Sequence, residues 1–147
     1  MCIGHPSVMI ASDAIPYTPD GQGHPRTAGC YCRVLGKYVR EKQLLSLHDA
    51  IRKMTILPAR RLEKMSAAFR KKGRLQEGAD ADLTVFDPSN VTDNATFKEP
   101  MLPSSGVQHV LVLGVQVVCN GQLVNDGVNL TPGIGYKSNQ SIDKSNS

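Results

Sequence analysis

One carboxylate lies where the sequence could place reactive chemistry. Asp13 ends a short, almost unbroken apolar run over residues 7–11, a pattern typical of a strand buried on both faces of a parallel sheet. A loop rich in proline and glycine follows over residues 16–25. Because α/β barrels and open α/β sheets carry their chemistry at the carboxyl ends of such strands, Asp13 is a candidate site residue. The alternative is an aspartate that caps a helix or orders the loop.

The histidines form no ligand cluster in the sequence, although catalytic zinc needs about three protein ligands on a preformed frame. His48 falls in the first turn of an expected helix, facing solvent, and His109 falls on an expected strand with no partner nearby. His24 lies on the loop after Asp13. Together with Arg26, it could orient a substrate carboxylate or simply fix the loop.

The four cysteines are too few and too scattered for a disulfide scaffold, which favours a reducing cytoplasm. Cys30 and Cys32 could be read as half a metal site. Two residues apart on a helix, however, their side chains point about 200° apart. We therefore expect one buried thiol and one nearer the surface, and we interpret Cys119 as a small apolar residue.

Length and composition indicate one globular domain. The chain has 147 residues, 40% of them apolar and 20% charged, a balance that supports a core but is too short for a large enzyme. No apolar stretch approaches the roughly 18 residues of a membrane span, and no export leader is readable. These features predict a soluble cytoplasmic protein that does not associate with membranes.

A basic block covers residues 26–74, which hold 14 of the 17 lysines and arginines. Such a block can indicate a nucleic-acid partner. Here the basic residues fall between apolar positions at helical spacing, as on solvated helix faces. Neither an aromatic stacking strip nor a glycine-rich phosphate loop accompanies them. We therefore expect no nucleic-acid partner, and steeply salt-dependent binding to DNA would support the alternative.

The elements that must position these residues change type along the chain. Helical spacing marks residues 33–40, Ser46 with Asp49 signals the start of a second helix, and Pro58 can open a third. A strand is expected at residues 83–86, followed by a hairpin around Gly114 and a tight turn at Asn120-Gly121. The chain end, residues 126–147, is expected to be a flexible tail.

Several of these segments resemble a known family when taken in order. The matching segments are Ser12-Asp13, His24-Pro25-Arg26, Arg33-Val34-Leu35-Gly36, Leu44-Leu45-Ser46-Leu47, Arg52-Lys53-Met54-Thr55, Leu57-Pro58-Ala59, Gly73-Arg74-Leu75, Gly78-Ala79-Asp80-Ala81-Asp82-Leu83, Phe86-Asp87-Pro88 and Asp93-Asn94-Ala95-Thr96-Phe97. The sequence resembles the C-terminal part of the N-acyl-D-amino-acid deacylases (D-aminoacylases), a branch of the amidohydrolase superfamily. The likeness covers about residues 7–125. The sequence departs from the family pattern at Ala14, at Cys30-Tyr31-Cys32 and at Leu113-Gly114.

This resemblance implies an α/β fold. Residues 1–72 would be the C-terminal piece of a (β/α)8 barrel, with residues 7–13 as its eighth strand and residues 27–70 as closing helices. Residues 73–125 would be the C-terminal share of a small composite β-sandwich. Because a whole barrel takes about 250 residues, the chain is expected to be a fragment.

The resemblance also implies a function, the zinc-dependent hydrolysis of N-acyl-D-amino acids to a carboxylate and a D-amino acid. Asp13 would be the proton-transferring carboxylate and a possible metal ligand, and His24 and Arg26 would contact substrate. The family's other zinc ligands come from earlier strands, so the isolated chain is expected to be inactive and to bind no zinc. Its partner would be the missing N-terminal part of the same protein. A non-catalytic remnant that binds a partner through exposed strand edges is the alternative.

Overall fold

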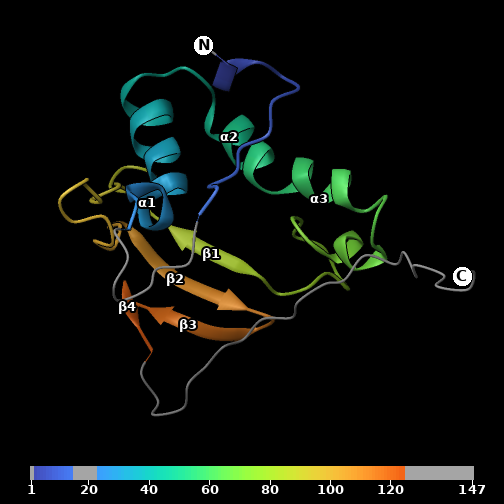
Figure 1. Cartoon of the computed structure of the whole chain (residues 1–147). Helices are drawn as coiled ribbons and strands as arrows, with labels where there is room; N and C mark the ends of the chain where they lie inside the picture. The colour runs from blue at the N-terminus through green and yellow to red at the C-terminus, as the bar shows by residue number, and fades with distance from the viewer. Residues whose placement is uncertain (1, 15–22, 125–147) are drawn as a thin grey trace, which may run out of the picture.

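The computed structural model describes residues 2–14 and 23–124, which form a group of helices beside an antiparallel sheet (Figure 1). The fold is therefore α/β in content, as predicted. The predicted flexible tail lies outside the described residues, as does most of the predicted loop over residues 16–25. Within the described residues, no helix has the length and apolar character needed to cross a membrane.

The helical part begins with a short 3-10 turn, η1 (Cys2–Gly4), and an extended segment over residues 8–14. Helix α1 (Pro25–Arg33) continues without a break into η2 (Val34–Glu41), a π-helix. Two short helices follow, α2 (Leu47–Met54) and α3 (Ile56–Leu62), and then a 3-10 turn, η3 (Ala67–Lys71). The helical pattern predicted for residues 33–40 is thus present, although the helix starts earlier, at Pro25.

Local capping explains where the helices start. Ser46 Oγ accepts a hydrogen bond from the Asp49 main-chain nitrogen at 3.0 Å, so the predicted capping box at α2 is confirmed. The predicted start of the third helix at Pro58 is wrong, because α3 begins at Ile56, directly after the distorted residue Thr55. Helix α3 ends at Leu62, and η3 begins five residues later, at Ala67.

Across residues 23–124, the sheet is a four-stranded meander in the order β1 (Leu83–Phe86), β2 (Val107–Val112), β3 (Val115–Cys119) and β4 (Gln122–Leu123). Leu113 and Gly114 both have positive φ, as do Asn120 and Gly121. Two-residue turns of this kind match the twist of antiparallel strands. Both tight turns and the strand at 83–86 are confirmed.

The apolar core lies between the helices, the extended N-terminal segment and the loop that follows β1. Its buried members come from η2, α2 and the loop after β1: Val34, Leu35, Ala50 and Val91. Ile10, Phe86 and Val107 pack against this group from the extended segment and from the sheet. The core therefore joins the extended segment, the helices and the sheet.

Arg40 ties η2 to the loop that follows β1. Its Nη1 donates to the main-chain oxygens of Val91 at 2.6 Å and Pro88 at 3.3 Å, and its Nη2 donates to Thr92 Oγ1 at 3.2 Å. Gly36 faces the same loop, and a side chain there would come within 2.7 Å of the Val91 oxygen. Because η2 packs so tightly here, the helix and the loop hold each other in place.

Residues 7–13 differ from the sequence prediction. The segment is extended but pairs with no strand of the sheet, so the predicted strand is not formed within the described residues. Its side chains alternate: Val8, Ile10 and Ser12 are half-buried, whereas Met9 and Asp13 are exposed. A strand buried on both sides needs a neighbouring strand along each edge, and none lies there among residues 2–14 and 23–124.

Candidate functional site

Asp13 lies at the end of the extended segment, beside the first turn of α1. Its φ of 51° is in the left-handed region, which aspartate tolerates better than most residues. The carboxylate pairs with Arg26, whose Nη2 lies 3.3 Å from Asp13 Oδ2, while 84% of the Asp13 side chain stays exposed. One oxygen is thus oriented by a guanidinium, and the carboxylate is otherwise open to an incoming group.

His24 and Arg26 form the start of α1. The Nδ1 atom of His24 accepts a hydrogen bond from the Arg26 main-chain nitrogen at 3.1 Å, which makes His24 the N-cap, and Pro25 takes the first helical position. When the ring is neutral, this hydrogen bond requires that Nε2 carry the proton. The sequence left open whether His24 contacts substrate or fixes the loop. As the N-cap of α1, His24 has the structural role of fixing the end of the loop.

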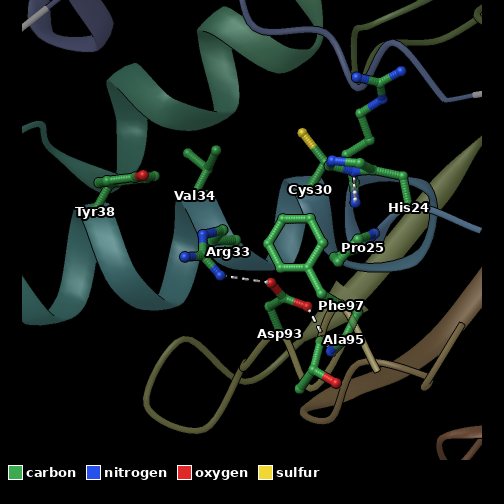
Figure 2. A pocket seen from close by; sticks show the side chains of 11 residues that line it. His24, Pro25, Cys30, Arg33, Val34, Tyr38, Asp93, Ala95 and Phe97 are labelled. Atoms are coloured by element: carbon green, nitrogen blue, oxygen red, sulfur yellow. Dashed lines mark hydrogen bonds and ion pairs between the residues drawn. The ribbon is translucent and has the colours of Figure 1, made fainter. Parts of the chain in front are cut away.

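A pocket of about 540 Å³ opens between α1, η2 and the loop over residues 93–97 (Figure 2). It is lined by His24, Pro25, Arg26, Cys30, Arg33, Val34, Tyr38, Asp93, Ala95, Thr96 and Phe97. The Phe97 ring projects from the loop toward the helix and meets the His24 ring edge-on, with centroids 5.4 Å apart and planes at 85°. Two of the predicted site residues, His24 and Arg26, therefore line one cavity, and Arg26 joins it to Asp13.

Asp93 is the buried charge of this pocket. Its side chain is only 5% exposed; Oδ2 lies 3.2 Å from Arg33 Nη1, and Oδ1 accepts from the Ala95 main-chain nitrogen at 2.9 Å (Figure 2). The hydrogen bond that Arg33 donates to the Asp93 carboxylate raises the pKa of Arg33 above its ordinary value. This pairing compensates the cost of burying a carboxylate. Gly29 lies against the same carboxylate, and a Cβ there would overlap it.

The sequence prediction did not give Asp93 or Arg33 a role. Asp93 entered only as part of a family motif, and Arg33 only as part of a helical pattern and of a family motif. One local signal was available, because an aspartate whose side chain accepts from the amide two residues later is a common turn former. The contact between Asp93 and Gly29 joins residues far apart in the sequence, so no local sequence signal predicts it.

Cys30 lines the pocket, whereas Cys32 packs against the core. Both are half-buried, so the prediction of one buried thiol and one nearer the surface is wrong. The Cys30 thiol donates to the Ala11 oxygen at 3.7 Å. Burial raises the pKa of Cys30, and the nearby charge of Asp93 raises it further, so this thiol is a poor nucleophile.

The remaining histidines stay apart from this pocket. His48 is exposed on α2, as predicted. His109 has a partner on the neighbouring strand, since its Nδ1 lies 3.0 Å from Gln116 Nε2, so the prediction that it lacks one is wrong. Cross-strand neighbours such as these follow from the register of the hairpin, which the sequence does not fix residue by residue.

The described residues do not by themselves fit the zinc that the resemblance implies. Across residues 2–14 and 23–124, no group of three or more histidine, cysteine, aspartate or glutamate side chains is placed to hold a metal ion. Asp13 is the candidate ligand of that segment, and its partner here is the positively charged Arg26. A ligand set for catalytic zinc would need further groups beside Asp13.

Comparisons with known proteins match most of the chain. The model of the amidohydrolase family covers residues 5–118. The N-acyl-D-glutamate deacylase of Alcaligenes xylosoxydans xylosoxydans is 47% identical over 113 residues, which make up 77% of this chain and 22% of that protein. The chain thus spans about a fifth of the length of this relative.

Two solved structures resemble the fold. One is N-acyl-D-glutamate deacylase from Bordetella bronchiseptica complexed with zinc and a phosphonate inhibitor (TM-score 0.70, 47% identity, 78% of this chain and 23% of that one). The other is a D-aminoacylase studied for its binuclear metal centre (TM-score 0.74, 36% identity, 84% and 24%). The sequence match and the shared fold lead to the same conclusion: this chain belongs to the amidohydrolase family.

Proposed function

We propose that this chain supplies the C-terminal share of an enzyme that hydrolyses N-acyl-D-amino acids to a carboxylate and a D-amino acid. The observation that carries the proposal is the position of Asp13, which is open to solvent and oriented by Arg26 beside a pocket. The family of the chain and the activities of its relatives, an N-acyl-D-glutamate deacylase and a D-aminoacylase, support the same class of substrate.

The proposed role of Asp13 is proton transfer. Amide hydrolysis forms a bond from water oxygen to the acyl carbon and breaks the carbon–nitrogen bond, so the water must lose a proton and the departing amine must gain one. A carboxylate can accept the first proton and deliver it to the nitrogen. The Arg26 guanidinium would hold the carboxylate in one orientation during both transfers.

His24 and Arg26 are the proposed substrate contacts. His24 offers an N–H at Nε2 when its ring is neutral, since Nδ1 is occupied by the helix cap. Arg26 offers a positive charge that suits the carboxylate of an N-acyl amino acid. The apolar pocket walls, which include Val34 and Phe97, would suit the acyl group or the side chain.

The proposed architecture follows the family. We propose that residues 1–72 close a (β/α)8 barrel, that residues 7–13 act as its eighth strand once neighbours are present, and that residues 73–125 complete a small β-sandwich. The alternating exposure of residues 8–13 supports this, because the outward side chains would be covered by the rest of a barrel. The zinc of such an enzyme would draw its other ligands from outside the described residues.

The proposed setting is the cytoplasm, with a small molecule and the N-terminal part of the enzyme as partners. All four cysteines lie within the described residues and are free thiols, which suits a reducing compartment. Several basic side chains of residues 26–74, among them Arg33, Arg40 and Lys53, form ion pairs or hydrogen bonds with other residues of the chain. Because these side chains are already engaged, this region is less suited to binding nucleic acid.

A chimeric enzyme tests the proposal. In the Alcaligenes N-acyl-D-glutamate deacylase, residues 5–118 of this chain would replace the matching segment. We expect hydrolysis of N-acetyl-D-glutamate by the chimera, and Asp13→Asn should lower kcat by about 10²–10⁴-fold, the usual size of a general acid–base contribution. Glu77→Gln, at an exposed carboxylate, is the matched control. An Asp13→Asn chimera that folds and keeps full kcat would refute the role of Asp13.

The isolated chain provides a second test. We expect no hydrolysis and no stoichiometric zinc, because the described residues offer no complete ligand set. Metal analysis after dialysis against zinc measures this directly. Tight one-to-one zinc binding that depends on Asp13 would contradict the proposed sharing of the site with another part of the enzyme.

A further inference from the structure

Lys53 is a buried cation that the proposed chemistry does not use. It lies on α2 with 1% of its surface exposed. Its Nζ donates to the main-chain oxygens of His5 and Val8, the latter at 3.0 Å. Its own main-chain oxygen accepts from the Ile10 nitrogen at 3.1 Å. One residue of α2 thus holds the N-terminal segment at three points.

The nature of these contacts argues for a specific role. Burying an ammonium costs several kcal/mol unless its donors are satisfied. A methionine or leucine at this position would fill similar space without that cost. The lysine gains two hydrogen bonds of the charge-assisted, stronger kind, and both of its acceptors belong to the segment that leads to Asp13. The cation is therefore positioned to fix the course of this segment.

The same segment is held again farther along. The Cys30 thiol contacts the Ala11 oxygen, and Arg26 pairs with Asp13. Figure 1 shows the segment passing α2 and descending toward α1. Lys53 holds its beginning, and α1 holds its end, so the backbone that carries Asp13 is supported from two helices.

We propose that Lys53 is a positioning residue, which sets where Asp13 stands by anchoring residues 5–10 to α2. The anchoring is a property of this chain alone, and its consequence for catalysis rests on the proposed function. The two parts make separate predictions, so they can fail separately.

Hydrogen exchange tests the anchoring in the chain itself. In Lys53→Met, which keeps the volume and removes the donors, the Ile10 amide should exchange about tenfold faster, the size expected from losing hydrogen bonds of ordinary strength. The amides of the β2–β3 hairpin should change less than about twofold. Lys64→Met, at an exposed lysine, is the control and should leave both unchanged.

Two results would overturn the anchoring. One is an unchanged Ile10 amide, and the other is an equal rise in the hairpin, which would make Lys53 a general stabiliser of the fold. If Lys53→Met does not fold, acylation of the unaltered chain decides the question. Lys53 should react at least about tenfold more slowly than Lys64, because its amine is buried and donates to two main-chain oxygens. Equal rates would refute the anchor.

A double-mutant cycle in the chimeric enzyme tests the catalytic consequence. Lys53→Met should lower kcat about tenfold when Asp13 is present and should have little further effect in an Asp13→Asn background, since a positioning residue acts through the group that it positions. Equal losses in both backgrounds would overturn the positioning role. If Asp13→Asn itself has no effect, the proposed function fails while the exchange result still stands.

Discussion

At the scale of single residues, the contact between Gly29 and Asp93 sets the shape of the pocket. Asp93 is buried against α1 and pairs with Arg33 on the same helix. A side chain at Gly29 would overlap the carboxylate, so the helix can approach the loop only because this position is glycine. The buried ion pair and the glycine therefore depend on each other.

Gly29→Ala should consequently destabilise the chain by about 1–3 kcal/mol, the usual cost of overpacking a tight contact. Alanine favours helix, so any loss would come from the contact with Asp93 rather than from helix propensity. Urea unfolding followed by circular dichroism measures the change. Gly4→Ala is the control, because its nearest neighbour, the Leu44 oxygen, lies at an ordinary 3.5 Å. Equal effects of the two substitutions would contradict the structure.

Asp87 makes a second testable contribution at this scale. Its carboxylate accepts hydrogen bonds from the Asn90 side chain and from the Ser89 main-chain nitrogen, and together these hold its pKa below the ordinary 3.8. A lowered pKa in the folded state means that the stabilisation is complete above the ordinary value and is lost as the pH falls through the folded-state value.

We therefore expect Asp87→Asn to make the free energy of unfolding depend less steeply on pH at acidic pH. Between about pH 6 and pH 3, the unaltered chain should lose more free energy of unfolding than the variant, which cannot titrate at this position. Urea unfolding across this range gives the comparison, and the difference between the two curves isolates Asp87 from other carboxylates. Parallel curves would show that the turn after β1 does not depend on this charge.

At the scale of elements, α2 depends on its cap. Ser46 Oγ accepts from the Asp49 nitrogen and also donates to the Asp49 carboxylate at 2.8 Å. Ser46→Ala should lower the free energy of unfolding by about 1 kcal/mol, the typical value for loss of an N-cap. Ser46→Thr keeps both the acceptor and the hydroxyl donor and should retain most of the stability. Chemical denaturation measures both, and equal stability of all three chains would contradict a capping role.

Elements with local signals were predicted from the sequence, and those that depend on distant partners were not. The cap at Ser46 and the turns at Gly114 and Asn120-Gly121 act within a few residues, so their positions were correct. The strand at residues 7–13 needs neighbouring strands, and the start of α1 depends on His24 as a cap. The described residues cannot supply those strands, and a histidine cap carries little signal in sequence.

The candidate site divides in the same way. Asp13, His24 and Arg26 were predicted as one group, and the structure brings Arg26 to both the other two. Asp93 and Lys53 were missed, because each gains its role from a residue or backbone segment more than 40 positions away. Burial of a charged residue is a tertiary property, which periodicity alone does not reveal.

At the scale of the whole molecule, apolar side chains remain on the surface. Leu75 is 88% exposed, Phe97 is 83% exposed and Leu123 is 81% exposed. Single exposed apolar residues are ordinary, but here they accompany an extended segment whose outward side chains include Met9. Surfaces of this kind favour association or aggregation.

The purified chain should therefore associate as its concentration rises, which light scattering coupled to gel filtration would detect. Leu75→Glu combined with Leu123→Glu should shift the distribution toward monomer. Gln76→Glu adds a charge at a neighbouring exposed position and serves as the control for charge alone. If the chain is a soluble monomer at all concentrations and melts in one sharp cooperative transition, the exposed apolar residues do not drive association and the prediction is wrong.

The acceptors of Lys53 are main-chain carbonyls, which every type of residue possesses. The anchor itself therefore uses no side-chain atom of residue 5, although the exposed His5 ring accepts a hydrogen bond from the Ser7 nitrogen at 3.3 Å. In a saturation library, position 5 should tolerate most side chains, whereas position 53 should accept few. The contact that holds this segment would then depend on the side chain at one position, residue 53, and not on a pair of side chains that must change together.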